Sequence, residues 1–213
     1  MHAAVPQATA VALGTVVLVR HGRTDANKQH YCGWEDVPLN PVGVAQAQIA
    51  ADVLEGVAVD AVFSSSLSRA SATAAPIAAR HDRLVEQRDD LREINYGRYQ
   101  GLPKADKPFS LRKDHKEIPM PGGESLADLF VRVRRFCGEI LPDLARGRTI
   151  AVVGHYWSNR MLAAALDGGT VNDALAADYK PANGSVYALT VTTEASHRVV
   201  SRRWMTPVPN ASP

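Results

Sequence analysis

Residues 15–22 read Thr-Val-Val-Leu-Val-Arg-His-Gly, and this stretch decides how the rest of the chain is interpreted. Thr15 to Val19 form an apolar, mostly β-branched run after Gly14, which predicts a short buried strand. Arg20 and His21 follow the strand directly. They could make structural hydrogen bonds at a strand end, or they could carry chemistry.

Two other predicted strands end in the same way. Residues 60–63 lead to Ser64 and, one helical turn later, to Arg69, and residues 149–153 lead to Gly154 and His155. Further strands are expected near 84–85, 185–191 and 198–204. Helices are expected over 41–55 (capped by Asn40, with Ala45, Ile49, Val53 and Leu54 as apolar positions), 67–80, 124–145 and 158–166.

Strands that alternate with helices predict an α/β fold of three layers, α/β/α, with a mostly parallel sheet and helices on both faces. Ligands of such folds bind at the carboxyl ends of the strands. We therefore expect Arg20, His21, Arg69 and His155 to meet in one crevice.

Composition limits the classes of partner. The chain has 213 residues, 46% of them hydrophobic and 22% charged, which is typical of one ordinary globular domain. A net charge of +2 is too even for a general nucleic-acid or membrane-surface binder. Cys32 and Cys137 lie too far apart in sequence to suggest a disulfide framework, so we expect a cytoplasmic protein. Residues 1–14 are interpreted as a flexible leader without an export signal, 15–205 as a single domain and 206–213 as a disordered tail.

The residues at the strand ends suit phosphoryl transfer. Guanidinium groups match phosphate oxygens, and a neutral histidine can attack phosphorus. In this hypothesis Arg20, Arg69 and a protonated His155 hold the phosphoryl group, and His21 is the nucleophile.

The leaving oxygen also needs a proton, and Glu93 is the candidate acid, with Asp89 or Asp90 as the fallback. Cys32 lacks the Cys-x5-Arg arrangement of a cysteine phosphatase. The histidines show no metal-ligand spacing, so no metal is expected.

Several separated blocks resemble the histidine phosphatase superfamily, the phosphoglycerate mutase-like proteins. The resemblance extends from about Val16 to Tyr187 and rests on agreement of the blocks in order and spacing. The blocks are Leu18–Thr24 with its Arg-His-Gly, Gly33–Leu39, Ser65–Ala74, Leu91–Gly101, Pro121–Leu126 and Val153–His155.

The resemblance implies a phosphoglycerate mutase-like fold with a small inserted cap at about 102–120. It implies that His21 forms a phosphohistidine and that Glu93 acts first as acid and then as base, without a cofactor. Arg20, Arg69 and His155 would hold the phosphoryl group, Asn27 would assist them, and Gly33, Tyr96 and Lys104 would contact the substrate. Tyr156 departs from the family pattern, and we expect it to contact the substrate as an aromatic wall.

A mutase must exclude water from its phosphohistidine, whereas a phosphatase must admit it. Three departures from the mutase pattern favour a phosphatase. Ile94 and Asn95 stand where mutases typically carry Arg and His. The insertion between Gly101 and Pro121 is shorter than in cofactor-dependent mutases, which use an arginine pair there to grip the substrate carboxylate. Tyr156 and Trp157 replace the usual glycine after the second histidine. The predicted activity is hydrolysis of a small phosphomonoester.

Two alternatives stay open: a phosphoglycerate mutase-type phosphotransferase, and a non-catalytic sensor of phosphorylated ligands. The basic residues of the cap have two interpretations. They either form an exposed, solvated face or act as a lid that attracts a second anionic group of the substrate. They are Lys104, Lys107, Arg112, Lys113 and Lys116. No nucleic acid or membrane partner is expected, and the sequence leaves a homodimer open.

Overall fold

The computed structural model describes residues 13–26, 29–106, 108–193 and 196–206. Its strands are β1 (Leu13–Arg20), β2 (Ala61–Ser65), β3 (Val85–Arg88), β4 (Thr149–Gly154), β5 (Val186–Thr192) and β6 (Arg198–Trp204). They form one sheet in the order β3-β2-β4-β1-β5-β6. The first four in that order are parallel, and β5 is antiparallel to β1. The predicted α/β fold with a mostly parallel sheet is confirmed.

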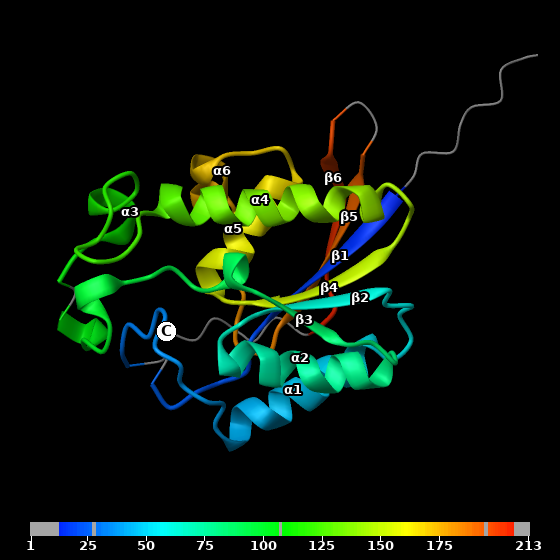
Figure 1. Cartoon of the computed structure of the whole chain (residues 1–213), viewed down its shortest axis with the longest axis horizontal. Coiled ribbons are helices and arrows are strands. Elements are labelled where there is room, and N and C mark those ends of the chain that lie inside the picture. The colour runs from blue at the N-terminus through cyan, green and yellow to red at the C-terminus, as the bar shows by residue number, and fades with distance from the viewer. Residues whose placement is uncertain (1–12, 27–28, 107, 194–195, 207–213) are drawn as a thin grey trace, which may run out of the picture.

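Helices cover both faces of the sheet (Figure 1). One face carries α1 (Pro41–Leu54) and α2 (Ser68–Arg80), and the other carries α4 (Leu126–Leu144), α5 (Tyr156–Leu166) and α6 (Val171–Ala176). The short helix α3 (Leu111–Asp114) stands beyond the end of the sheet. Short 3-10 turns lie at Asp89–Leu91, Gly97–Tyr99 and Lys104–Asp106.

The central strand β1 explains why residues 15–19 are so uniformly apolar. Val16 and Leu18 pack in the core cluster that contains the apolar face of α4. Val17 and Val19 pack in the cluster that contains α1 and α2. Both faces of this strand are therefore buried, as expected for a strand in the middle of a three-layer fold.

The buried face of α1 differs from our expectation. Asn40 caps the helix as predicted, accepting a bond of 2.9 Å from the backbone N–H of Gly43. Ile49, however, is 52% exposed. The residues that face the sheet and α2 are mostly small: Gly43, Ala47, Ala50, Ala51 and Leu54. Because α2 is also rich in alanine, the two helices approach closely, and larger side chains are left on the outer surface.

Several boundaries also shift. Strand β1 begins at Leu13 rather than Thr15, and α5 begins at Tyr156 rather than Ser158. Helices α3 and α6 were not predicted, although Thr170 and Asp173 form a capping box at the start of α6. Of the expected leader and tail, residues 1–12 and 207–213 lie outside the described residues. None of the described helices meets the length and hydropathy needed to span a bilayer.

The cap insertion packs over the carboxyl end of the sheet through aromatic rings. Phe109 lies 4.9 Å from Tyr31 and 4.5 Å from Tyr99, measured between ring centroids. An isolated bridge joins His30 to Pro103. These contacts fix Lys104, the first cap residue with a charge, close to the end of β1. Lys107 lies outside the described residues.

Candidate active site

The ends of β1 and β4 bring two histidines together. Arg20 and Gly154 are register partners in the parallel pair, and the backbone N–H of His21 donates to the Gly154 carbonyl at 2.9 Å. The imidazole rings of His21 and His155 therefore lie side by side, with centroids 4.9 Å apart and planes tilted by 56°. The predicted convergence at the carboxyl edge is present in the structure.

The His21 ring has a defined orientation and tautomer. Its Nδ1 lies 2.7 Å from the carbonyl oxygen of Gly22. A carbonyl only accepts, so Nδ1 carries the proton and Nε2 holds the lone pair. Burial, reinforced by Arg69 and Arg20, lowers the pKa of His21 well below its ordinary value. The ring is therefore neutral and able to attack through Nε2.

The backbone around His21 is clamped from two sides. The Asn183 side-chain amide donates to the His21 carbonyl at 3.0 Å, and the Gly22 N–H donates to Thr73 Oγ1 at 3.0 Å. Gly22 also packs directly on α1, because a Cβ added there would meet the Gly43 carbonyl oxygen at 2.3 Å. The backbone of His21 and Gly22 is thus held by α1, α2 and the loop before β5.

Two arginines place positive charge beside His21. Arg69, at 2% exposure, donates to the backbone carbonyls of Gly33 and Glu35, each at 2.7 Å. Arg20 donates through Nη1 to the Pro181 carbonyl at 2.8 Å, and its Nε is buried without a hydrogen-bond partner among the described residues. Its guanidinium lies over the Tyr156 ring, 5.5 Å from the centroid.

His155, which we expect to hold the phosphoryl group in its protonated form, is completely buried. Burial lowers its pKa well below the ordinary value, with Arg69 and His21 adding to the effect. These influences favour the neutral ring, so the negative charge of a phosphoryl group would be needed to favour its protonation. Both ring nitrogens are buried without a hydrogen-bond partner in the described part of the chain, which leaves an N–H able to donate to an oxygen placed between the two histidines.

Glu93 stands in the irregular segment after Asp89–Leu91, with its carboxylate against the N-terminus of α5, and is only 9% exposed. Its carboxylate accepts from the backbone N–H of Ile94 at 3.0 Å and from those of Tyr156 and Trp157 at 3.1 Å. Burial nevertheless raises the pKa of Glu93, against the opposing influence of Ile94, Arg20 and Arg69. A buried carboxyl with a raised pKa beside a nucleophile is suited to proton transfer.

The two fallback acids, Asp89 and Asp90, form contacts outside the cavity that contains His21. The Asp89 carboxylate accepts from Ser66 and pairs with Arg92, and the Asp90 carboxylate pairs with Arg135 on α4. Neither aspartate lines the cavity that contains His21. Glu93 is therefore the acid that the geometry favours.

A cavity of about 330 Å³ joins these groups, and most of the predicted site residues line it. His155 lies behind it, against His21. Asn27 lies outside the described residues. The lining residues are Arg20, His21, His30, Cys32, Gly33, Arg69, Glu93, Tyr96, Lys104, Tyr156 and Trp157.

His30 and Cys32 were not predicted in this role, because they stand in a loop without a pattern. No group of three or more His, Cys, Asp or Glu side chains able to hold a metal ion occurs in the described ranges. A second cavity, of about 510 Å³, lies between α5, α6, β5 and β6 and contains none of the predicted site residues.

The comparisons with known proteins agree with this geometry. The model of the histidine phosphatase superfamily (branch 1) matches residues 16–203. The chain therefore belongs to the histidine phosphatase superfamily.

Its relatives carry two kinds of name. A 2,3-bisphosphoglycerate-dependent phosphoglycerate mutase of Mesorhizobium japonicum is 39% identical over 168 residues, covering 72% of this chain and 82% of that protein. One of Allorhizobium ampelinum is 35% identical over 201 residues, covering 88% and 95%. The structure of a mycobacterial glucosyl-3-phosphoglycerate phosphatase is 28% identical, with a TM-score of 0.77, and covers 90% of this chain and 97% of that one.

Proposed function

We propose that this chain is a metal-independent phosphatase that hydrolyses a small-molecule phosphomonoester through a phosphohistidine at His21. The observation that carries the proposal is the Nδ1 contact of His21 with the Gly22 carbonyl. It leaves the Nε2 lone pair next to Arg20, Arg69 and His155, the groups that would stabilise a transferring phosphoryl group.

In the first step, Nε2 of His21 forms a bond to phosphorus as the bond from phosphorus to the ester oxygen breaks. Glu93 gives its proton to that leaving oxygen, and the alcohol departs. In the second step, Glu93 takes a proton from water, and the water oxygen displaces His21 from phosphorus. Inorganic phosphate leaves, and Glu93 is protonated again.

The cap supports hydrolysis rather than transfer between two substrate positions. Among the described cap residues, Lys104 is the one whose side chain lines the cavity. Arg112 lies instead over the Trp157 ring, 5.9 Å from its centroid, and Arg112 and Lys113 are exposed. This cap therefore brings no pair of arginines onto the substrate, and the phosphohistidine stays accessible to water.

A phosphoglycerate mutase-type phosphotransferase is the second candidate, because the curated relatives described above are named as mutases. Tyr96 and Lys104 both line the cavity, where they would contact the substrate of such an enzyme. This activity would need a bisphosphorylated primer and a phosphohistidine that resists water.

The test is phosphate release from a panel of phosphomonoesters in the presence of a chelator, with wild type and His21→Ala. The panel includes 3-phosphoglycerate with and without its bisphosphate, and the organic product is followed as well. We expect chelator-resistant release that His21→Ala abolishes. Isomerisation of phosphoglycerate without release would contradict hydrolysis and establish the mutase. No turnover by the wild type would contradict both enzymes and favour the sensor.

A further inference from the structure

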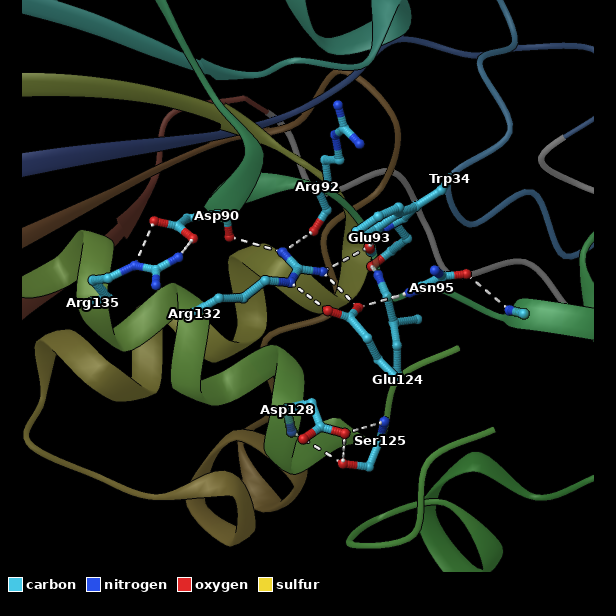
Figure 2. Close-up of polar contacts among 12 residues, drawn as sticks. Trp34, Asp90, Arg92, Glu93, Asn95, Glu124, Ser125, Asp128, Arg132 and Arg135 are labelled. Atoms are coloured by element: carbon cyan, nitrogen blue, oxygen red, sulfur yellow. Dashed lines mark hydrogen bonds and ion pairs between the residues drawn. The ribbon is translucent and has the colours of Figure 1, made fainter. Parts of the chain in front are cut away.

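Arg132, on α4, lies outside the cavity and yet contacts the segment that carries Glu93 (Figure 2). Its Nη1 donates to the backbone carbonyls of Asp90 at 2.8 Å and Arg92 at 2.7 Å, and its Nη2 donates to the carbonyl of Glu93 at 2.8 Å. One side chain thus binds three carbonyls of a segment that is irregular in structure and about forty residues away in sequence.

The remaining N–H groups of Arg132 bind Glu124. Nε donates to Oε1 at 2.8 Å and Nη2 to Oε2 at 2.9 Å, and both side chains are mostly buried, at 12% and 17% exposure. A guanidinium has five N–H groups, so these five bonds use all of them. Lysine has three donors on one atom and cannot reproduce this planar arrangement.

Glu124 ties the next residues of the same segment to the start of α4. Its Oε2 accepts from the Asn95 N–H at 2.9 Å, and its own N–H donates to the Asn95 carbonyl at 2.9 Å. The Glu93 carbonyl also has a second donor, because Trp34 Nε1 lies 2.7 Å from its oxygen. Figure 2 shows Trp34 and Arg132 approaching this carbonyl from different elements.

We infer that Arg132 is a positioning residue for Glu93: its three hydrogen bonds to backbone carbonyls hold residues 90–93 so that the Glu93 carboxyl faces the leaving oxygen, and its two bonds to Glu124 hold the guanidinium in place. The inference rests on the proposed function, which assigns the proton transfer to Glu93. Because Arg132 does not line the cavity, its removal should affect the step that needs a well-placed proton and leave phosphoryl binding intact.

The experiment compares Arg132→Met and Arg132→Lys with Arg135→Met. Arg135 is the matched control because it sits on the same helix, is 67% exposed and pairs with the Asp90 carboxylate rather than with the backbone. Each variant is assayed on an alkyl phosphate, whose alkoxide needs a proton to leave, and on p-nitrophenyl phosphate, whose phenolate does not. Binding of vanadate and the thermal unfolding midpoint are measured for each.

We expect kcat/KM on the alkyl phosphate, which reports the first step alone, to fall by about 100-fold in both Arg132 variants, since a small misplacement of a reacting group can cost that much. We expect a much smaller fall on p-nitrophenyl phosphate and an unchanged Kd for vanadate. Arg135→Met should match the wild type. If Arg132→Met fails to fold, Arg132→Lys, which keeps the positive charge and the aliphatic part of the side chain, is the variant that tests the positioning role.

A double-mutant comparison removes the remaining ambiguity. In a Glu93→Gln background, the Arg132 substitution should cause no further loss on the alkyl phosphate, because the residue it positions can no longer donate. Equal losses on both substrates, weaker vanadate binding, a full additional loss in the Glu93→Gln background or the same loss in Arg135→Met would each overturn the inference. A wild type without His21-dependent phosphate release would overturn the proposed function instead.

Discussion

His21 and His155 face each other across the parallel pair β1 and β4, with ring centroids 4.9 Å apart. Neither ring is held by the other: Nδ1 of His21 bonds to the Gly22 carbonyl, and both nitrogens of His155 lack a partner among the described residues. His21, Arg20 and Arg69 line the cavity, and His155 lies behind it, against His21. The two guanidinium groups are suited to the oxygens of a tetrahedral anion placed there.

Glu93→Gln should separate substrates by their leaving groups. We expect kcat/KM on an alkyl phosphate, which reports the first step alone, to fall by about 10²- to 10⁴-fold, the usual contribution of a general acid, with a far smaller fall on p-nitrophenyl phosphate. Because burial raises the pKa of Glu93, the protonated donor persists to higher pH than for an exposed carboxyl. The fall of kcat/KM with rising pH in the wild type should therefore disappear in the variant. Equal losses on both substrates would exclude Glu93 as the proton donor.

Lys104→Met should reveal whether the substrate has a second anionic group. A charge-assisted hydrogen bond contributes about 1.5–3 kcal/mol, so kcat/KM should fall by about 10- to 100-fold for phosphomonoesters with a second carboxylate or phosphate. Simple alkyl phosphates should be nearly unaffected. Lys113→Met is the control, because Lys113 is exposed on the cap. A uniform loss across the panel would instead place Lys104 on the transferred phosphoryl group.

Stability should fall in mild acid because His155 stays neutral in the fold. Its pKa lies well below the ordinary 6.5 when folded, whereas the unfolded chain takes up a proton near 6.5. The unfolded state therefore binds more protons below that pH, and the free energy of unfolding decreases as the pH falls. One such histidine accounts for up to about 1.4 kcal/mol between pH 7.5 and 5.5.

Urea unfolding of wild type and His155→Asn at those two pH values checks this prediction. The variant should lose less stability than the wild type on acidification, and the remaining loss should include the contribution of His21, whose pKa burial also lowers. An identical pH dependence in both proteins would mean that His155 is exposed to protonation in the fold.

Two glycine substitutions should have opposite effects on stability. In Gly22→Ala the new Cβ would meet the Gly43 carbonyl oxygen at 2.3 Å, backbone against backbone. We expect a loss of about 1–3 kcal/mol in the free energy of unfolding and a loss of activity, because His21 is displaced. Gly138→Ala, on α4 with nothing near its added Cβ, should gain about 0.5–1 kcal/mol and keep full activity. A tolerated Gly22→Ala would contradict the close packing of the His21 loop on α1.

The sequence was sufficient to predict the sheet and the convergence of Arg20, His21, Arg69 and His155. The reason is that a strand buried on both faces has a uniformly apolar sequence, and parallel strands end at the same edge. The predicted apolar face of α1 was wrong at Ala45 and Ile49, which are exposed, and correct at Leu54, which is buried. Close packing of two alanine-rich helices buries Ala47 and leaves Ile49 on the outer surface.

Contacts between side chains and carbonyls distant in sequence could not be predicted from the sequence. Arg132 stands on a helix whose polar positions look like an ordinary solvated face, and nothing in its spacing indicates that its guanidinium binds carbonyls near residue 90. The lowered pKa of His155 was also beyond prediction, because it results from burial, and burial depends on tertiary packing.

The most direct test of the central claim is to trap the phosphoenzyme. Wild type is mixed with a phosphomonoester in the presence of a chelator, quenched rapidly in alkali, and analysed by mass spectrometry of its peptides. The account predicts one phosphoryl group on His21, stable in alkali and lost in acid, formed and consumed at rates that sustain turnover, and absent from His21→Ala. Turnover by His21→Ala, or a wild type that releases phosphate without ever carrying a phosphoryl group on His21, would contradict the account.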